Sequence, residues 1–286
     1  MARVIINADD FGINPIVTSE IERMIELGIV TSTTIMANGS CLDEVKKFAL
    51  LHPKTSFGIH LCLSEFDSIT KSETLQRYGI IDSNGQFFKF AIFNVKRFPD
   101  DLKKAIRQEL IAQVDIIKSL NIPISHIDSH HHVHTIYQLH DVFEDVMACY
   151  GFNKIRLGTK VEPIRMVKQR FFKRSATSVP TGKKTDGPIK THRNIVKRIG
   201  SLLSATVYRY LLNRRLQSLY KTTDAFFSYS SFLQRLHERE AIKYKTVELM
   251  CHPGHPGRNY KDEMHMVEAK IIETGNRIEL ISYNEL

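Results

Sequence analysis

The chain has 286 residues, of which 42% are hydrophobic and 25% are charged, and this composition excludes an intrinsically disordered protein. A chain of this length buries roughly 75% of the surface that its unfolded form exposes, so its core needs no disulfide or metal ion. The four cysteines stand far apart without paired spacing, which predicts free thiols in a reducing compartment. The N-terminal residues contain no apolar region long enough for a signal peptide, and the sequence has no run of about 18 apolar residues, so we expect a cytoplasmic protein without a membrane span.

The net charge of +9 is concentrated in one segment. Residues 160–215 hold 15 Lys or Arg but only two acids, Glu162 and Asp186, a local balance of +13 that exceeds the charge of the whole chain. We interpret this segment as a solvated insertion at about 160–225 within a single domain over 1–286. No nucleic-acid-reading motif accompanies the basic residues, so nucleic acid is not an expected partner, whereas an acidic or phosphorylated ligand remains open.

Strands and helices alternate along the sequence. In chain order, the apolar patterns predict a strand at Val4–Asn7, a helix at Pro15–Leu27, a strand at Ser32–Met36, a helix at Leu42–Leu51, a strand at Ser56–Leu63, a helix at Leu102–Leu120, a strand at Ser125–Asp128, a helix at Ile136–Tyr150, and strands at Lys154–Leu157 and Lys245–Met250. Repeated units of this kind form a parallel sheet, which is either open or closed as a barrel.

Polar residues fall at the carboxyl ends of several of these predicted strands. They are Asp9 with Asp10, His60, the histidines of 130–134, Arg156 and His252. In a closed barrel the carboxyl ends of the strands converge on one mouth, where such enzymes build their active sites. The fold class we expect is therefore α/β, a distorted parallel (β/α) barrel with one site at its mouth.

The strongest signal for chemistry is the histidine-rich run HIDSHHHVH at 126–134, with five histidines and one aspartate in nine residues. A packed core cannot easily satisfy the ring nitrogens of so many imidazoles. One carboxylate and two imidazoles suit a divalent first-row ion with open positions for water and substrate, and the remaining histidines would orient ligands or contact substrate. We expect Asp10, His60 and His130 to be the ligands.

Simpler interpretations exist for these residues taken singly. An Asp pair before Phe-Gly can cap a helix, and one histidine in an apolar strand is usually structural. His252 follows an apolar strand that Pro253 ends, which is compatible with a general acid or with an exposed loop histidine.

Five motifs resemble the YdjC-like family of carbohydrate deacetylases, whose known member acts on chitooligosaccharides. In chain order they are NADDFG (7–12), GIVTSTTIMANG (28–39), FGIHLCLSE (57–65), HIDSHHHVH (126–134) and ELMCHPG (248–254). The resemblance implies a distorted (β/α) barrel that hydrolyses an N-acetyl group from a sugar. The basic segment matches none of these motifs.

The resemblance also implies roles for individual residues. Asp10, His60 and His130 would hold a divalent ion, Mg²⁺ by resemblance, with Zn²⁺ chemically plausible. Asp9 would be the base, and His252 and Arg156 would be catalytic by similarity to the wider deacetylase superfamily. The expected partner is an acetylated sugar, and a homodimer is left open.

Three alternative functions compete with a deacetylase. A metal-dependent phosphoesterase uses the same His and Asp inventory, and the basic segment would suit its substrate. A glycoside hydrolase needs two carboxylates about 5–10 Å apart without a metal, which does not explain the histidines. A non-catalytic carbohydrate-binding protein would be expected to carry aromatic platforms, but the chain has no Trp.

Overall fold

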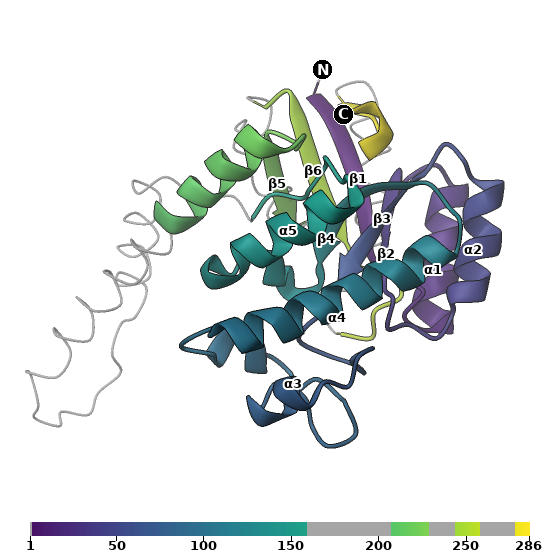
Figure 1. Cartoon of the computed structure of the whole chain (residues 1–286). Helices are drawn as coiled ribbons and strands as arrows, with labels where there is room; N and C mark the ends of the chain where they lie inside the picture. Colours follow the sequence, from purple (N-terminus) through teal and green to yellow (C-terminus); the bar gives the residue numbers. More distant parts are fainter. Residues whose placement is uncertain (1, 159–206, 229–243, 258–277) are drawn as a thin grey trace, which may run out of the picture.

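The computed structural model describes residues 2–158, 207–228, 244–257 and 278–286 (Figure 1). The strands are β1 (Ala2–Phe11), β2 (Ser32–Ile35), β3 (Ser56–Leu61), β4 (Ile124–Ser129), β5 (Ala225–Ser228), β6 (Thr246–Cys251) and β7 (Ile278–Leu280). The α-helices are α1 (Pro15–Glu26), α2 (Leu42–Leu51), α3 (Glu73–Arg77), α4 (Asp100–Ser119) and α5 (His140–Tyr150), with a further helix at 207–219. Short 3₁₀ turns cover Ala91–Asn94, His130–Thr135, Tyr137–Leu139 and Tyr283–Glu285.

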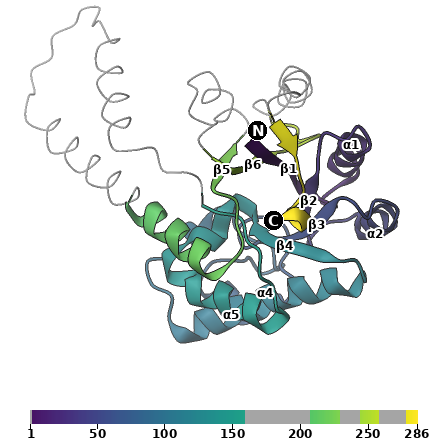
Figure 2. The ribbon, with the colours of Figure 1, turned by 90° about the horizontal axis from the view of Figure 1, so that it is seen from above.

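The strands form one parallel sheet in the order β4-β3-β2-β1-β6-β5, with β7 paired to the start of β1. Seen from above, they follow an arc, and α1, α2, α4 and α5 lie on its outer side (Figure 2). The α/β fold with a parallel barrel-type sheet, expected from the sequence, is thus confirmed. The strands form a half-barrel. Because every strand points the same way, the carboxyl ends of β1, β3, β4 and β6 lie at one rim.

The helices bury apolar stripes against the sheet. In α1, the Asn14 side chain accepts a hydrogen bond from the Val17 amide and so caps the helix, and Pro15 occupies its first turn. Ile21 and Met24 on the inner face of α1 are fully buried. This packing fixes the loop that follows the carboxyl end of β1, where the two aspartates lie.

The predicted strand at Lys154–Leu157 is absent as a strand. Lys154 and Ile155 instead make single bridges, Ile155 with Ile127 of β4 and Lys154 with Lys221 near β5. Because one residue pairs with β4 and the next with the chain near β5, neither side forms a continuous ladder of backbone hydrogen bonds. The segment nevertheless links the two edges of the half-barrel and directs the Arg156 side chain toward carboxylates of β1, β4 and β6.

The C-terminal turn fills the other end of the half-barrel, inside the arc in Figure 2. Tyr283 is completely buried, and its ring stacks on that of His126 with 3.6 Å between centroids. Ser282 and Glu285 form a capping box around the turn. Tyr283 therefore belongs to the interior, which the sequence pattern did not indicate.

The structure also bears on the other predictions. All four cysteines are free thiols. No helix within the described ranges has the length and apolar character to cross a membrane.

The basic residues from 160 to 206 lie outside the described residues. From 207 onward the segment is part of the fold, because Leu212 and Leu216 are buried and Asn213 exchanges two hydrogen bonds with Gly158.

Candidate active site

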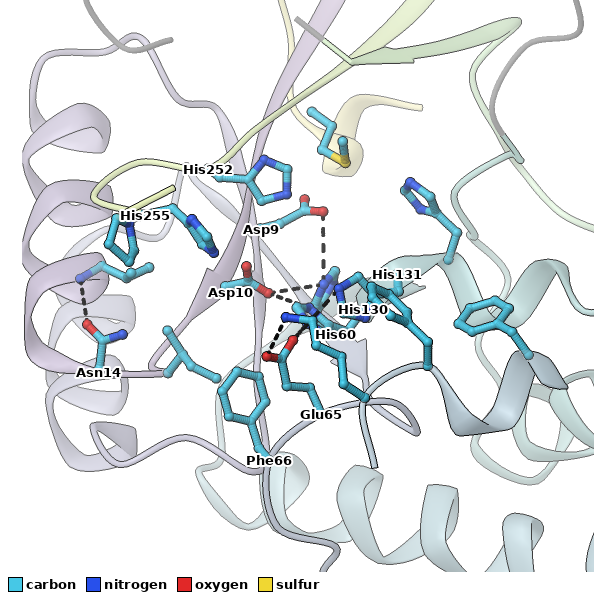
Figure 3. Close-up of a pocket in the computed structure, with 18 residues that line it drawn as sticks. Asp9, Asp10, Asn14, His60, Glu65, Phe66, His130, His131, His252 and His255 are labelled. Atoms are coloured by element: carbon cyan, nitrogen blue, oxygen red, sulfur yellow. Dashed lines mark hydrogen bonds and ion pairs between the residues drawn. The ribbon is translucent and has the colours of Figure 1, made fainter. Parts of the chain in front are cut away.

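A cavity of about 850 Å³ opens at the carboxyl ends of β1, β3, β4 and β6 (Figure 3). Its polar lining includes Asp9, Asp10, His60, Glu65, His130, His131, His132 and His252. The structure therefore brings together all the residues predicted for the site except Arg156, which lies behind the cavity wall.

A break in the register of β1 brings both aspartates to this cavity. Successive side chains of a regular strand point to opposite faces. The pairing of β1 with β2 shifts between Ala8 and Phe11, and Asp10 adopts a left-handed φ of 71°. Bulges and strained residues of this kind are typical of functional sites. Asp9 and Asp10 can consequently act on one reaction centre.

Asp10, His60 and His130 form a buried cluster that could hold a metal ion, with donor atoms within 4.8 Å of one another. Asp10 Oδ1 lies 2.9 Å from His130 Nδ1 and 3.3 Å from His60 Nε2. Burial lowers the pKa of His130, but the hydrogen bonds to Asp10 and Glu65 outweigh it and hold the pKa well above its usual value. Two imidazoles and a carboxylate, buried together at one point, fit a divalent first-row ion.

Asp128 orients one of these candidate ligands. Its Oδ1 lies 2.5 Å from His60 Nδ1, so the other ring nitrogen, Nε2, faces Asp10. Asp128 also accepts a hydrogen bond from Thr34 and pairs with Arg156. A carboxylate behind a ligating histidine fixes the tautomer and raises the basicity of the ligand. Asp128 was not identified from the sequence, although it stands inside the histidine-rich run.

Asp9 is held from behind by Arg156. The guanidinium donates two hydrogen bonds of 2.7 and 2.6 Å to the two carboxylate oxygens, and the Asn7 amide donates a third. Burial raises the pKa of Asp9, but Arg156 and the imidazole of His60 outweigh it, so the pKa lies well below the usual range. Asp9 is therefore an oriented, ionised carboxylate, and Arg156 acts through it.

The same guanidinium continues the network toward the base of the half-barrel. Arg156 Nε donates to Glu248 Oε1 at 2.7 Å, and the Tyr283 hydroxyl donates to Glu248 Oε2 at 2.5 Å. Burial raises the pKa of Glu248 to about 7, against the opposing effects of Arg156 and Tyr283. Glu248 lies in a quoted motif, but neither it nor Tyr283 was identified as a site residue, because only the fold brings them together.

The five histidines of the run divide into two groups. His130, His131 and His132 line the cavity, the latter two with left-handed φ angles of 52° and 58°. Burial lowers the pKa of His132 to about 3, so this ring is neutral. His126 and His134 point away from the cavity, toward Tyr283 and Ser129. Only part of the run therefore fits the expected contact with ligands or substrate.

His252 follows β6 and lines the cavity next to Asp9 (Figure 3). Its ring centroid is 6.3 Å from that of His255. The place fits a group that exchanges a proton with a substrate held near Asp9 and Asp10. Its predicted role as general acid stays a proposal.

The fold and the site together define a parallel half-barrel with a candidate divalent-metal centre at its carboxyl rim. A sequence profile of the YdjC-like protein family matches residues 3–279, and the chain belongs to this family. The resemblance found in the motifs is thereby confirmed.

Several curated relatives carry the name carbohydrate deacetylase. The protein of Vibrio campbellii is 36% identical over 148 residues, which cover 52% of this chain and 56% of the relative. The protein of Oceanobacillus iheyensis is 35% identical over 140 residues, covering 49% of this chain and 58% of the relative. The chain thus spans a little over half the length of the curated relatives it matches.

A solved structure supports the fold. It is described as a putative cellobiose-phosphate cleavage protein from Enterococcus faecalis V583, with a TM-score of 0.63 and 21% identity. The match covers 99% of this chain and 98% of the other. At this level of identity the similarity concerns the fold alone.

Proposed function

We propose that this protein is a metal-dependent carbohydrate deacetylase that removes an N-acetyl group from a sugar of the chitooligosaccharide type. The observation that carries the proposal is the buried cluster of Asp10, His60 and His130 beside Asp9 and His252 in one cavity. The curated relatives are named carbohydrate deacetylases, which supports removal of an acetyl group from a carbohydrate.

In this proposal Asp10, His60 and His130 hold the metal ion. When bound, a divalent ion lowers the pKa of a water ligand, to about 7 in zinc enzymes, and polarises a carbonyl. Imidazole donors suit Zn²⁺, whereas Mg²⁺ prefers oxygen donors. The two histidines therefore favour Zn²⁺ over the Mg²⁺ that the family resemblance implies.

The remaining residues move protons. Asp9, kept ionised by Arg156, takes a proton from the attacking water as its oxygen bonds to the acetyl carbon. Protonated His252 gives a proton to the sugar nitrogen as the C–N bond breaks. The products are acetate and a sugar amine. Arg156 touches neither product in this scheme, and its role is to position Asp9.

The test is acetate release from N-acetylglucosamine oligomers by the native protein, with and without a chelator. We expect release that stops on chelation and returns on addition of Zn²⁺. Free phosphate from sugar phosphates without any acetate would support the phosphoesterase alternative instead. Acetate release that survives complete metal removal would contradict the metal-dependent mechanism.

A further inference from the structure

Glu65 lines the cavity next to the ring of His130, but the proposed reaction gives it no role (Figure 3). The two oxygens of its carboxylate face different groups. Oε2 lies 3.4 Å from Nε2 of His130, and Oε1 lies 2.8 Å from Nζ of Lys89. Because Lys89 pairs with one oxygen, the other oxygen faces the histidine ring.

The contact with Glu65 determines where the His130 ring carries its proton. An ionised carboxylate only accepts hydrogen bonds, so Nε2 of His130 must donate. A neutral imidazole has one N–H and one lone pair, and a metal ion binds the lone pair. In His130 the lone pair is then on Nδ1, which lies 2.9 Å from Asp10 Oδ1. The nitrogen left for a metal ion is therefore the one on the side of the candidate centre.

His60 has the opposite arrangement. Its Nδ1 lies 2.5 Å from Asp128 Oδ1, and its Nε2 lies 3.3 Å from Asp10 Oδ1. The rings of His60 and His130 are 5.6 Å apart and inclined at 77°, and each turns a different nitrogen toward the same oxygen of Asp10. Each histidine thus has a carboxylate on the side away from the candidate centre.

Helix α4 anchors the chain on both sides of Glu65. Gln113 donates a hydrogen bond of 2.7 Å to the Cys62 carbonyl and accepts one of 2.8 Å from the Cys62 amide. Glu109 accepts hydrogen bonds from the amide and the hydroxyl of Thr70. Gln113 and Glu109 are completely buried. This anchoring suits a carboxylate whose function depends on a fixed position.

A second ion at Glu65 is the competing interpretation, because Glu65, His130 and His131 also have donor atoms within 4.8 Å of one another. Such an ion would need the lone pair of His130 on Nε2, and a neutral ring cannot offer lone pairs on both nitrogens at once. The ammonium of Lys89, 2.8 Å from Glu65, would also lie beside the ion and repel it. These observations favour a supporting role for Glu65 over a ligand role.

We propose that Glu65 is a positioning residue, which accepts a hydrogen bond from Nε2 of His130 and so presents Nδ1 of this ring to the metal ion. Asp128 presents Nε2 of His60 in the same way. The two histidines consequently bind the ion through opposite ring nitrogens. The proposal rests on the proposed function, since it concerns the same metal centre. A carboxylate behind a ligating histidine also raises the basicity of the ligand.

The first test is the Zn²⁺ affinity of Glu65→Gln, measured by competition with a chromogenic chelator. The glutamine amide can donate as well as accept, so it no longer fixes the proton on Nε2. We expect the affinity to fall by about 10- to 100-fold, the usual effect of losing such a carboxylate.

Lys89→Gln is the matched control, because it breaks the same ion pair but keeps the carboxylate behind His130. We expect its Zn²⁺ affinity to change by less than about threefold, as for other exposed pairs. Native affinity in Glu65→Gln, or an equal loss in both variants, would overturn the role of Glu65.

NMR of the Zn²⁺-loaded protein with isotope-labelled histidine tests the nitrogens directly. We expect one zinc-bound ring that carries its proton on Nε2 and another that carries it on Nδ1. Glu65→Gln should shift the N–H signal of the first ring, and Asp128→Asn that of the second. Zinc-bound rings that all carry the proton on the same nitrogen would contradict the proposal.

These measurements need no activity, so they separate the role of Glu65 from the proposed function. Zn²⁺ bound through the two expected nitrogens, without acetate release, would support the role of Glu65 and contradict the deacetylase. Acetate release with unchanged Zn²⁺ affinity in Glu65→Gln would overturn the role of Glu65 alone. A second ion per chain that is lost in Glu65→Gln would make Glu65 a ligand instead. A native protein that binds no Zn²⁺ would contradict both proposals.

Discussion

The carboxylate of Asp128 lies 2.5 Å from Nδ1 of His60, while Nε2 of the same ring lies 3.3 Å from Asp10. His60 thus lies between two carboxylates. Asp128 orients its ring, and Asp10 belongs to the same candidate metal centre. This relationship gives the centre a fixed geometry before any ion binds.

We predict that Asp128→Asn weakens metal binding by about 10- to 100-fold, the usual effect of losing the carboxylate behind a ligating histidine. The asparagine keeps the size of the side chain but loses its charge. The measurement is a competition titration of the metal-free protein with Zn²⁺ and a chromogenic chelator. Asp141→Asn is the control, because Asp141 is exposed and pairs only with Lys103 among the described contacts. Native affinity in Asp128→Asn would exclude the orienting role.

We predict that Asp9→Asn lowers kcat for acetate release by about 10²- to 10⁴-fold, the range for a lost general base, with a near-normal metal content. The reason is that Asp9 takes its hydrogen bonds from Arg156 and Asn7, whereas its contact with the candidate ligand His60, from Oδ2 to Nε2, is 3.9 Å long. Elemental analysis alongside the rate measurement distinguishes the two roles. Loss of metal together with activity would make Asp9 a ligand instead of a base.

A third prediction concerns the pH dependence of stability. The pKa of Glu248 is about 7 in the folded protein, above its ordinary value of 4.5, so the folded state binds the proton more tightly than the unfolded state does. Its contribution to the free energy of unfolding is therefore present below about pH 4.5 and lost as the pH rises through 7. Glu248→Gln cannot lose this proton.

The free energy of unfolding of the native protein minus that of Glu248→Gln should fall by on the order of 1–3 kcal/mol between pH 4.5 and 7.5. Denaturant unfolding of both proteins at several pH values measures this difference, and the other titrating groups cancel in the subtraction. A difference that stays constant over this range would show that Glu248 does not titrate there.

The sequence was sufficient to predict the parallel barrel and the gathering of the candidate ligands. Each candidate lies at the carboxyl end of an apolar strand, and parallel strands bring their carboxyl ends together. Asp10, His60 and His130 were found in this way without knowledge of any contact. The alternation of strand and helix also predicted most of the elements with errors of a few residues at their ends.

The supporting residues could not be predicted in the same way. The hydrogen bond between Tyr283 and Glu248 joins residues 35 apart, and the bond between Arg156 and Asp9 joins residues 147 apart. No local pattern marks such pairs. Phe90 lines the cavity and has a left-handed φ of 62°, a backbone angle that a sequence does not reveal for a residue other than Gly.

The most direct test of the account is the metal content of the native protein and of His130→Ala, measured by elemental analysis after dialysis against Zn²⁺ and then against metal-free buffer. We expect about one ion per native chain and less than about one tenth of an ion in the variant, because a metal site that loses one of three protein ligands binds far more weakly. Circular dichroism of both proteins verifies that the variant is folded. A folded His130→Ala protein that retains a full complement of metal would contradict the assignment of Asp10, His60 and His130 as the metal centre.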